Sequence, residues 1–255
     1  MCKRTIQRWI GFVLFGFAVS GTSLYAADDA VQFAFTADYF SKYIWRGQNL
    51  NDKSVFQPSF SVSKSGFTAN IWGNLELTDS REHSGEFTEF DYGLDYSAPV
   101  PEVNGISFSI GVLYYDFPNT SEKPTTEVYG GLNFDLPLAP YVKWYRDTQV
   151  NNGSYVQLGI GHTIEKLYEF SDKCYCGLQI GSSIGYGSSR YNRVYLDTEG
   201  WKLNDWTSFA SLPFCLDSWI IKPSINYSTM LNKDIREANE HSDNFWAGVS
   251  LSREF

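Results

Sequence analysis

Charged residues recur at alternate positions of segments that are otherwise rich in apolar residues, and these are the side chains that could do chemistry. In residues 87–97, for example, Glu89, Asp91 and Asp95 stand at odd positions, while the even positions are mostly apolar. Side chains two apart in a strand share one face, so such a segment presents a charged face and an apolar face. The candidates on the charged faces are Asp38, Lys42, Arg46, Glu76, Glu89, Asp91, Asp95, Glu127, Asp135, Lys143 and Lys222.

Acidic side chains outnumber basic ones in this set, and two interpretations follow. If the charged faces line a narrow channel, the excess negative charge favours cations and repels anions. Alternatively, the charges pair with one another across the interior and plug it, as side chains fill the interior of small barrels. Cation-selective conductance in planar bilayers is expected from the first interpretation and not from the second.

Catalytic and metal sites find less support in the sequence. The three histidines, His83, His162 and His241, are scattered, and Glu82-His83-Ser84 matches no recognised hydrolase motif. Two lumen carboxylates could imitate a glycosidase pair, but any acidic channel shows the same pairing. The histidine spacing also matches no metal site. We therefore predict a protein that is not an enzyme and has no cofactor and no metal.

The apolar alternation repeats along the chain and predicts the strands that position these side chains. Residues 106–114 show it most clearly, with apolar residues at every even position. The last twelve residues repeat the pattern and end on an aromatic residue. The predicted strands are residues 31–46, 54–63, 66–77, 87–97, 106–114, 125–135, 141–147, 153–163, 174–186, 205–214, 218–228 and 244–255.

Strands of this length with one apolar face predict an all-β fold, an antiparallel transmembrane β-barrel of about twelve strands within a range of ten to fourteen. Aromatic residues make up 17% of the chain, and no apolar run after residue 26 is long enough for a spanning helix. Long connections at residues 78–86, 116–124, 187–204 and 229–243 alternate with shorter turns. This predicts both termini and the turns on the periplasmic rim. A soluble secreted β-sandwich is the alternative fold, but its strands are usually shorter.

The N-terminus has the features of an exported protein. Lys3, Arg4 and Arg8 precede an apolar run at residues 9–19, and residues 24–26 form a cleavage site. We predict a signal peptide at residues 1–26 and a single barrel domain at residues 27–255; a membrane anchor is the alternative. Without the signal peptide the chain has 17 basic and 29 acidic residues, a net charge of −12 that argues against nucleic acid as a partner.

Three cysteines remain after removal of the signal peptide: Cys174, Cys176 and Cys215. The predicted topology places Cys176 and Cys215 at the same rim, which makes them the candidate disulfide, with Cys174 as an alternative partner. Free thiols are the other alternative, because strand register decides the distance between the two cysteines.

Several motifs resemble those of the TorF-type porin family. Residues 36–39 (TADY) and 43–47 (YIWRG) are similar to the family's opening signature, although residues 40–42 are extra between them. The likeness continues at residues 65–67, 71–74, 92–96 and 127–132 and covers about two-thirds of the mature chain. It implies an outer-membrane barrel of undefined solute without catalytic residues. It also implies that Phe255 is the signal that the barrel-assembly machinery reads on the terminal strand.

These observations predict a protein of the outer membrane of a Gram-negative-type bacterium, surrounded by outer-membrane lipid. The expected function is that of a porin or passive channel for small neutral or cationic solutes. The alternative is a closed barrel without an open pore, which would serve as a structural or surface-binding protein through its long loops.

Overall fold

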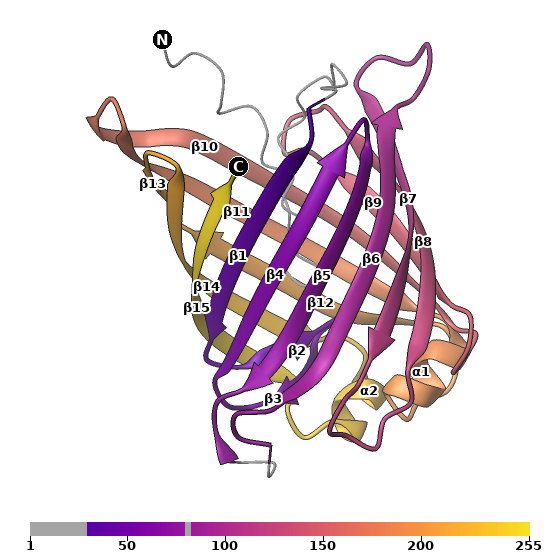
Figure 1. Cartoon of the computed structure of the whole chain (residues 1–255). Helices are drawn as coiled ribbons and strands as arrows, with labels where there is room; N and C mark the ends of the chain where they lie inside the picture. The colour runs from indigo at the N-terminus through magenta and orange to yellow at the C-terminus, as the bar shows by residue number, and fades with distance from the viewer. Residues whose placement is uncertain (1–29, 80–82) are drawn as a thin grey trace.

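The computed structural model describes residues 30–79 and 83–255, so the predicted signal peptide at residues 1–26 lies outside the described residues. The described chain forms a closed antiparallel barrel of twelve strands, which confirms the predicted fold class and strand number (Figure 1). The strands are β1 (Gln32–Phe40), β4 (Val55–Lys64), β5 (Phe67–Glu76), β6 (Phe87–Pro99), β7 (Ile106–Asp116), β8 (Thr125–Phe134), β9 (Tyr141–Asp147), β10 (Ser154–Ser171), β11 (Cys174–Gly187), β12 (Lys202–Ser211) with β13 (Phe214–Leu216), β14 (Trp219–Met230) and β15 (Asp243–Glu254).

The barrel closes where the last strand, β15, pairs with the first, β1. Ala34 lies opposite Glu254, and the ladder continues to the pair of Phe40 and Gly248. Strand β13 continues the position of β12, because both pair with β11 and β14. The strand predicted at residues 205–214 is therefore interrupted, at Leu212 and Pro213, and proline cannot donate a ladder hydrogen bond there.

The two faces of the strands follow the predicted alternation. Outward-facing apolar side chains are exposed, as at Leu94 (52%) and Ile110 (54%), whereas the inward-facing Asp91 (0%) and Glu127 (2%) are buried. A soluble protein has the opposite arrangement, while a barrel in a bilayer requires an apolar outer band around a polar interior. The predicted charged faces therefore point into the lumen, the space that the barrel encloses.

The two ends of the barrel differ in their connections. One end, the terminal rim, carries both ends of the described chain and the turns that follow β4, β6, β8, β10 and β13 (Figure 1). The opposite end, the loop rim, carries the long loops and the two helices, α1 (Ser189–Tyr195) and α2 (Lys233–Ala238). No helix among residues 30–79 and 83–255 has the length and hydropathy needed to cross a membrane.

The first predicted strand, residues 31–46, is wrong in its second half. Strand β1 ends at Phe40, and the chain then forms a separate two-stranded hairpin of β2 (Tyr43–Trp45) and β3 (Gln48–Asn51). Arg46 and Gly47 form its turn with φ of 46° and 81°. Positive φ at both turn positions is the geometry that favours tight hairpins, and glycine adopts it readily. Local turn chemistry thus overrides the alternation that continues through this segment.

Candidate functional site

The turn of the β2–β3 hairpin places Arg46 against the far wall of the lumen. The Arg46 guanidinium donates from Nη1 and Nη2 to the two carboxylate oxygens of Glu127 on β8, at 2.9 and 2.7 Å. The Tyr115 hydroxyl on β7 donates to the same carboxylate at 2.9 Å. The side chains of Arg46 and Glu127 are only 9% and 2% exposed, so this is a buried, two-pronged ion pair.

Aromatic rings surround the same guanidinium. The Arg46 Cζ lies 4.5 Å from the ring centroids of both Tyr145 on β9 and Tyr155 on β10, and 5.7 Å from that of Tyr191 on α1. Trp45 of the hairpin lies 4.6 Å away. Distances below about 6 Å are favourable for cation–π attraction. We call Glu127, Tyr145, Tyr155 and Tyr191 the Arg46 cage.

Several different elements build the Arg46 cage. Tyr145 and Tyr155 lie opposite each other in the ladder between β9 and β10, so their rings occupy one row of the inner wall. Tyr155 also donates a hydrogen bond to Asp205 on β12 at 2.9 Å. Its hydroxyl lies where a side chain at position 185 would project, so Gly185 makes room for it. Helix α1 begins at the Ser188 cap and brings Tyr191 over the same row.

The rest of the hairpin fills the lumen next to the cage. The Tyr43 hydroxyl donates to Glu89 on β6 at 2.8 Å, and the Tyr43 ring packs on Trp72 of β5. Trp45 packs against the rings of Tyr191 and Tyr195 on α1. These residues form one buried cluster at the loop-rim end of the lumen: Tyr43, Trp45, Val55, Trp72, Tyr155, Tyr191, Leu196, Met230 and Ile235.

Away from the Arg46 cage, other parts of the inner wall are polar rather than aromatic. Asp38, Ser250 and Lys222 face one another in register across β1, β15 and β14. The row continues through Gln57 on β4, which donates to Asn74 on β5 at 2.9 Å. Asp95 accepts a hydrogen bond from the Tyr129 hydroxyl at 2.6 Å, with Lys143 within electrostatic range. The polar parts of the inner wall therefore carry both charge signs.

The structure places most predicted lumen residues on the inner wall, but three lie elsewhere. Arg46 is in the hairpin turn instead of near the outer end of a strand, because β1 ends early. Lys42 lies in the connection before the hairpin and forms an ion pair with Asp52. This contact, together with a hydrogen bond from Asn49, lowers the pKa of Asp52. Asp135 follows β8 in an exposed turn at the terminal rim. On the inner wall lie Asp38, Glu76, Glu89, Asp91, Asp95, Glu127, Lys143 and Lys222.

Sequence reasoning missed the aromatic part of the site. Tyr115, Tyr145 and Tyr155 stand at inward positions of their strands, so alternation could have found them if aromatic residues had been considered as lumen residues. Tyr191 carries no such signal, because it lies on a helix within a predicted loop.

The predicted disulfide between Cys176 and Cys215 is not formed; Cys174, Cys176 and Cys215 are all free. In the ladder between β11 and β13, Cys215 lies opposite Tyr175. Cys174 and Cys176, one residue to either side, therefore direct their side chains to the other face. Within the described ranges no three His, Cys, Asp or Glu side chains gather in a group that could hold a metal ion.

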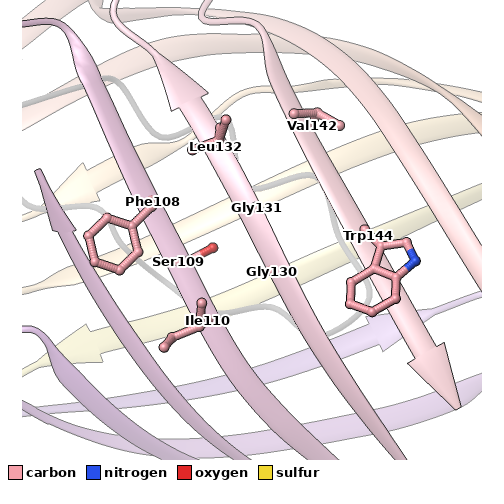
Figure 2. A pocket seen from close by; sticks show the side chains of 8 residues that line it. All are labelled: Phe108, Ser109, Ile110, Gly130, Gly131, Leu132, Val142 and Trp144. Atoms are coloured by element: carbon pink, nitrogen blue, oxygen red, sulfur yellow. The ribbon is translucent and has the colours of Figure 1, made fainter. Parts of the chain in front are cut away.

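A separate groove of about 380 Å³ lies on the outer face of β7, β8 and β9 (Figure 2). Gly130 leaves space between Ile110 and Trp144, its neighbours in register. Phe108, Leu132 and Val142 continue this apolar lining. The residues that line the groove include no titratable side chain, and the groove lies on the apolar outer face of the barrel.

Comparison with known proteins defines the family. Residues 25–206 match Gcw_chp, a bacterial protein family of unknown function. The chain belongs to this family. The match does not confirm the finer TorF-type resemblance; the barrel character rests on the fold itself and on the solved structures that share it. A comparison with curated proteins gave no match.

Solved structures with a similar fold include two porins. The NanC porin is 12% identical, with 87% of this chain and 98% of that chain covered and a TM-score of 0.50. The KdgM porin in complex with disordered oligogalacturonate is 11% identical, with 88% and 99% covered and a TM-score of 0.50. LpxR from Salmonella typhimurium is 8% identical, with 88% and 99% covered and a TM-score of 0.51. These likenesses show the fold, a porin-like outer-membrane β-barrel.

Proposed function

We propose that this protein is an outer-membrane channel for small neutral or cationic solutes, and that the β2–β3 hairpin closes its lumen in the state described. The observation that carries the proposal is the excess of acidic side chains on the inner wall. Six of the carboxylates predicted from the sequence line this wall, and the predicted cations among them are Lys143, Lys222 and the hairpin's Arg46. The six are Asp38, Glu76, Glu89, Asp91, Asp95 and Glu127. An excess of negative charge in a narrow, low-dielectric lumen favours cations.

The proposal includes the surroundings of the barrel. Export through a cleaved signal peptide at residues 1–26, with the terminal rim towards the periplasm, would place the long loops outside the cell. The apolar outer face would contact outer-membrane lipid. The TorF-type resemblance also implies an outer-membrane location. Absence of enzymatic activity remains part of the prediction.

A specific observation favours a second function, a closed barrel that acts through its loops. The buried cluster joins residues of β5, β10 and β14 across the lumen, and Met230 and Ile235 within it are 1% and 0% exposed. A permanently packed cluster would block any solute. The two proposed functions therefore differ in whether the β2–β3 hairpin can leave the lumen.

Replacing the hairpin tests both functions. Phe40 and Val55 are partners in the ladder between β1 and β4. An Asn-Gly turn in place of residues 41–54 would therefore join the two strands directly. In planar bilayers we expect this variant to conduct more than the wild type, with a reversal potential of the sign for cation selectivity.

The control is heat-modifiable migration on a gel, which shows that the variant is a folded barrel. A folded hairpin-replacement variant without conductance would favour the closed barrel. Anion selectivity would contradict the proposed solute class.

A further inference from the structure

The Arg46 cage has the construction of a ligand-binding site that is occupied by the chain's own side chain. Its four residues come from β8, β9, β10 and α1, none of which belongs to the hairpin that supplies the guanidinium. The hairpin strands form their own two-stranded sheet, separate from the barrel ladder. Side-chain contacts therefore account for the way the cage holds Arg46, as they would for a bound solute.

Withdrawal of Arg46 would leave the cage electrostatically incomplete. Glu127 is 2% exposed, and its remaining hydrogen bond would come from the neutral Tyr115 hydroxyl. Asp205, also buried, accepts a hydrogen bond from Tyr155 and adds negative charge. A carboxylate without a counter-charge in a narrow acidic lumen is costly, so an open state of the lumen is stabilised by a cation that takes the place of Arg46.

The geometry of the cage selects the kind of cation. Glu127 accepts two parallel hydrogen bonds, which suits a planar group with two adjacent N–H donors. The rings of Tyr145 and Tyr155 both approach the guanidinium to 4.5 Å, where a flat, weakly hydrated cation stacks well. An ammonium ion is a compact, strongly hydrated charge that satisfies neither feature as fully.

We propose that the Arg46 cage is a binding site for solutes that carry a guanidinium group, and that such a solute takes the place of Arg46 when the hairpin leaves the lumen. The inference names a solute class for the proposed channel. Only the role of this solute in transport rests on the proposed function. Binding at the cage itself can be measured without any transport.

The test uses the full mature protein folded in detergent micelles, with the Arg46→Ala substitution to empty the cage. Calorimetric titration with methylguanidinium should give saturable binding, about tenfold tighter than binding of methylammonium. The double variant Arg46→Ala/Glu127→Gln should lose this preference, because the carboxylate that accepts both donors is gone. The wild type should bind methylguanidinium more weakly than Arg46→Ala, since its own Arg46 competes.

Arg236→Ala is the matched control. Arg236 also pairs with a carboxylate, Asp243, but this pair lies exposed at the loop rim. Its removal should create no methylguanidinium site. Equal binding by Arg236→Ala and Arg46→Ala would overturn the inference, as would a folded Arg46→Ala barrel without preference for methylguanidinium.

If Arg46→Ala does not fold alone, refolding yield replaces calorimetry as the measurement. Methylguanidinium should then restore heat-modifiable barrels of Arg46→Ala and methylammonium should not; equal yields would overturn the inference. Binding to the cage together with no conductance in the hairpin-replacement variant would reject the channel and retain the site. Conductance of the hairpin-replacement variant together with no binding at the cage would reject the site and retain the channel.

Discussion

At the scale of residues, burial separates the contacts that hold the hairpin from those on the surface. Arg193 and Glu199 on the loop rim also form a two-pronged pair, at 2.7 and 2.8 Å, but both side chains are more than half exposed. Water and salt screen such a pair, so its contribution to stability is small. Arg46 and Glu127 are also joined by two hydrogen bonds, but away from water, where loss of one partner leaves a buried charge.

The hydroxyl of Tyr43 gives a prediction at this scale. Tyr43→Phe removes the donor to the buried carboxylate of Glu89 and keeps the ring on Trp72. We expect the free energy of unfolding to fall by about 1–3 kcal/mol, the cost of leaving a buried acceptor without its hydrogen-bond partner. Urea denaturation in lipid vesicles, followed by gel migration, would measure it.

Tyr39→Phe is the control for that measurement. Its hydroxyl bonds Ser54 on the exposed surface, so its loss should cost far less. Equal effects of the two substitutions would show that the contact with Glu89 does not stabilise the hairpin.

At the scale of elements, the β2–β3 hairpin decides the state of the lumen. Its turn fits between the cage on one side and β12 and β14 on the other, since a Cβ at position 47 would lie 2.5 Å from the Cβ of Asp205 and 3.1 Å from the sulfur of Met230. Glycine is required at this position for its positive φ and for this close approach.

Gly47→Ala is therefore expected to loosen the hairpin. Left-handed backbone costs an alanine about 1–2 kcal/mol, and overpacking against Asp205 adds about 1–3 kcal/mol. The same urea experiment would show the loss, and bilayer recordings should show a higher open probability.

Gly200→Ala is the matched control for Gly47→Ala. Gly200 has a φ of 86° with open space around its Cβ position, so alanine there bears the backbone strain alone. An equal loss of stability in both variants would show that contact with Asp205 adds nothing.

At the scale of the whole molecule, closure of the barrel depends on the terminal strand. The pairing of β15 with β1 leaves no open edge at this seam. The last rung joins Phe255 and Phe33, with N–H to carbonyl distances of 2.9 and 3.3 Å. Arg253 is the one charged residue on the apolar face predicted for this strand, and its guanidinium lies over the rings of Trp219 and Phe255.

Deletion of Phe255 should lower the fraction of chain assembled in the membrane. The deletion removes the last rung of the seam and also the aromatic group expected to act as the assembly signal. Heat-modifiable barrel in membrane fractions would measure assembly. Phe255→Ala separates the two causes, because it keeps the backbone rung; normal assembly of both variants would contradict the prediction.

Much of the fold could be predicted because the alternation of apolar and polar residues is a local property of each strand. Residues two apart share a face wherever the chain is extended, so the outward position of Ile110 and the inward position of Asp91 follow from the sequence alone. Repetition of this pattern on nearly every predicted strand indicated the barrel. The same rule failed at Arg46, where the alternating residues continue but positive φ at the turn reverses the chain.

The sequence by itself thus determined the strands, their two faces and the acidic character of the lumen. Only the tertiary structure decided that Arg46 meets Glu127, 81 residues away, and that Tyr191 on α1 completes the cage. The physical reason is that the closure of the barrel and the register of its strands depend on all of the strands together. They bring side chains from opposite walls into one low-dielectric space, and no local pattern in the sequence records which of them meet.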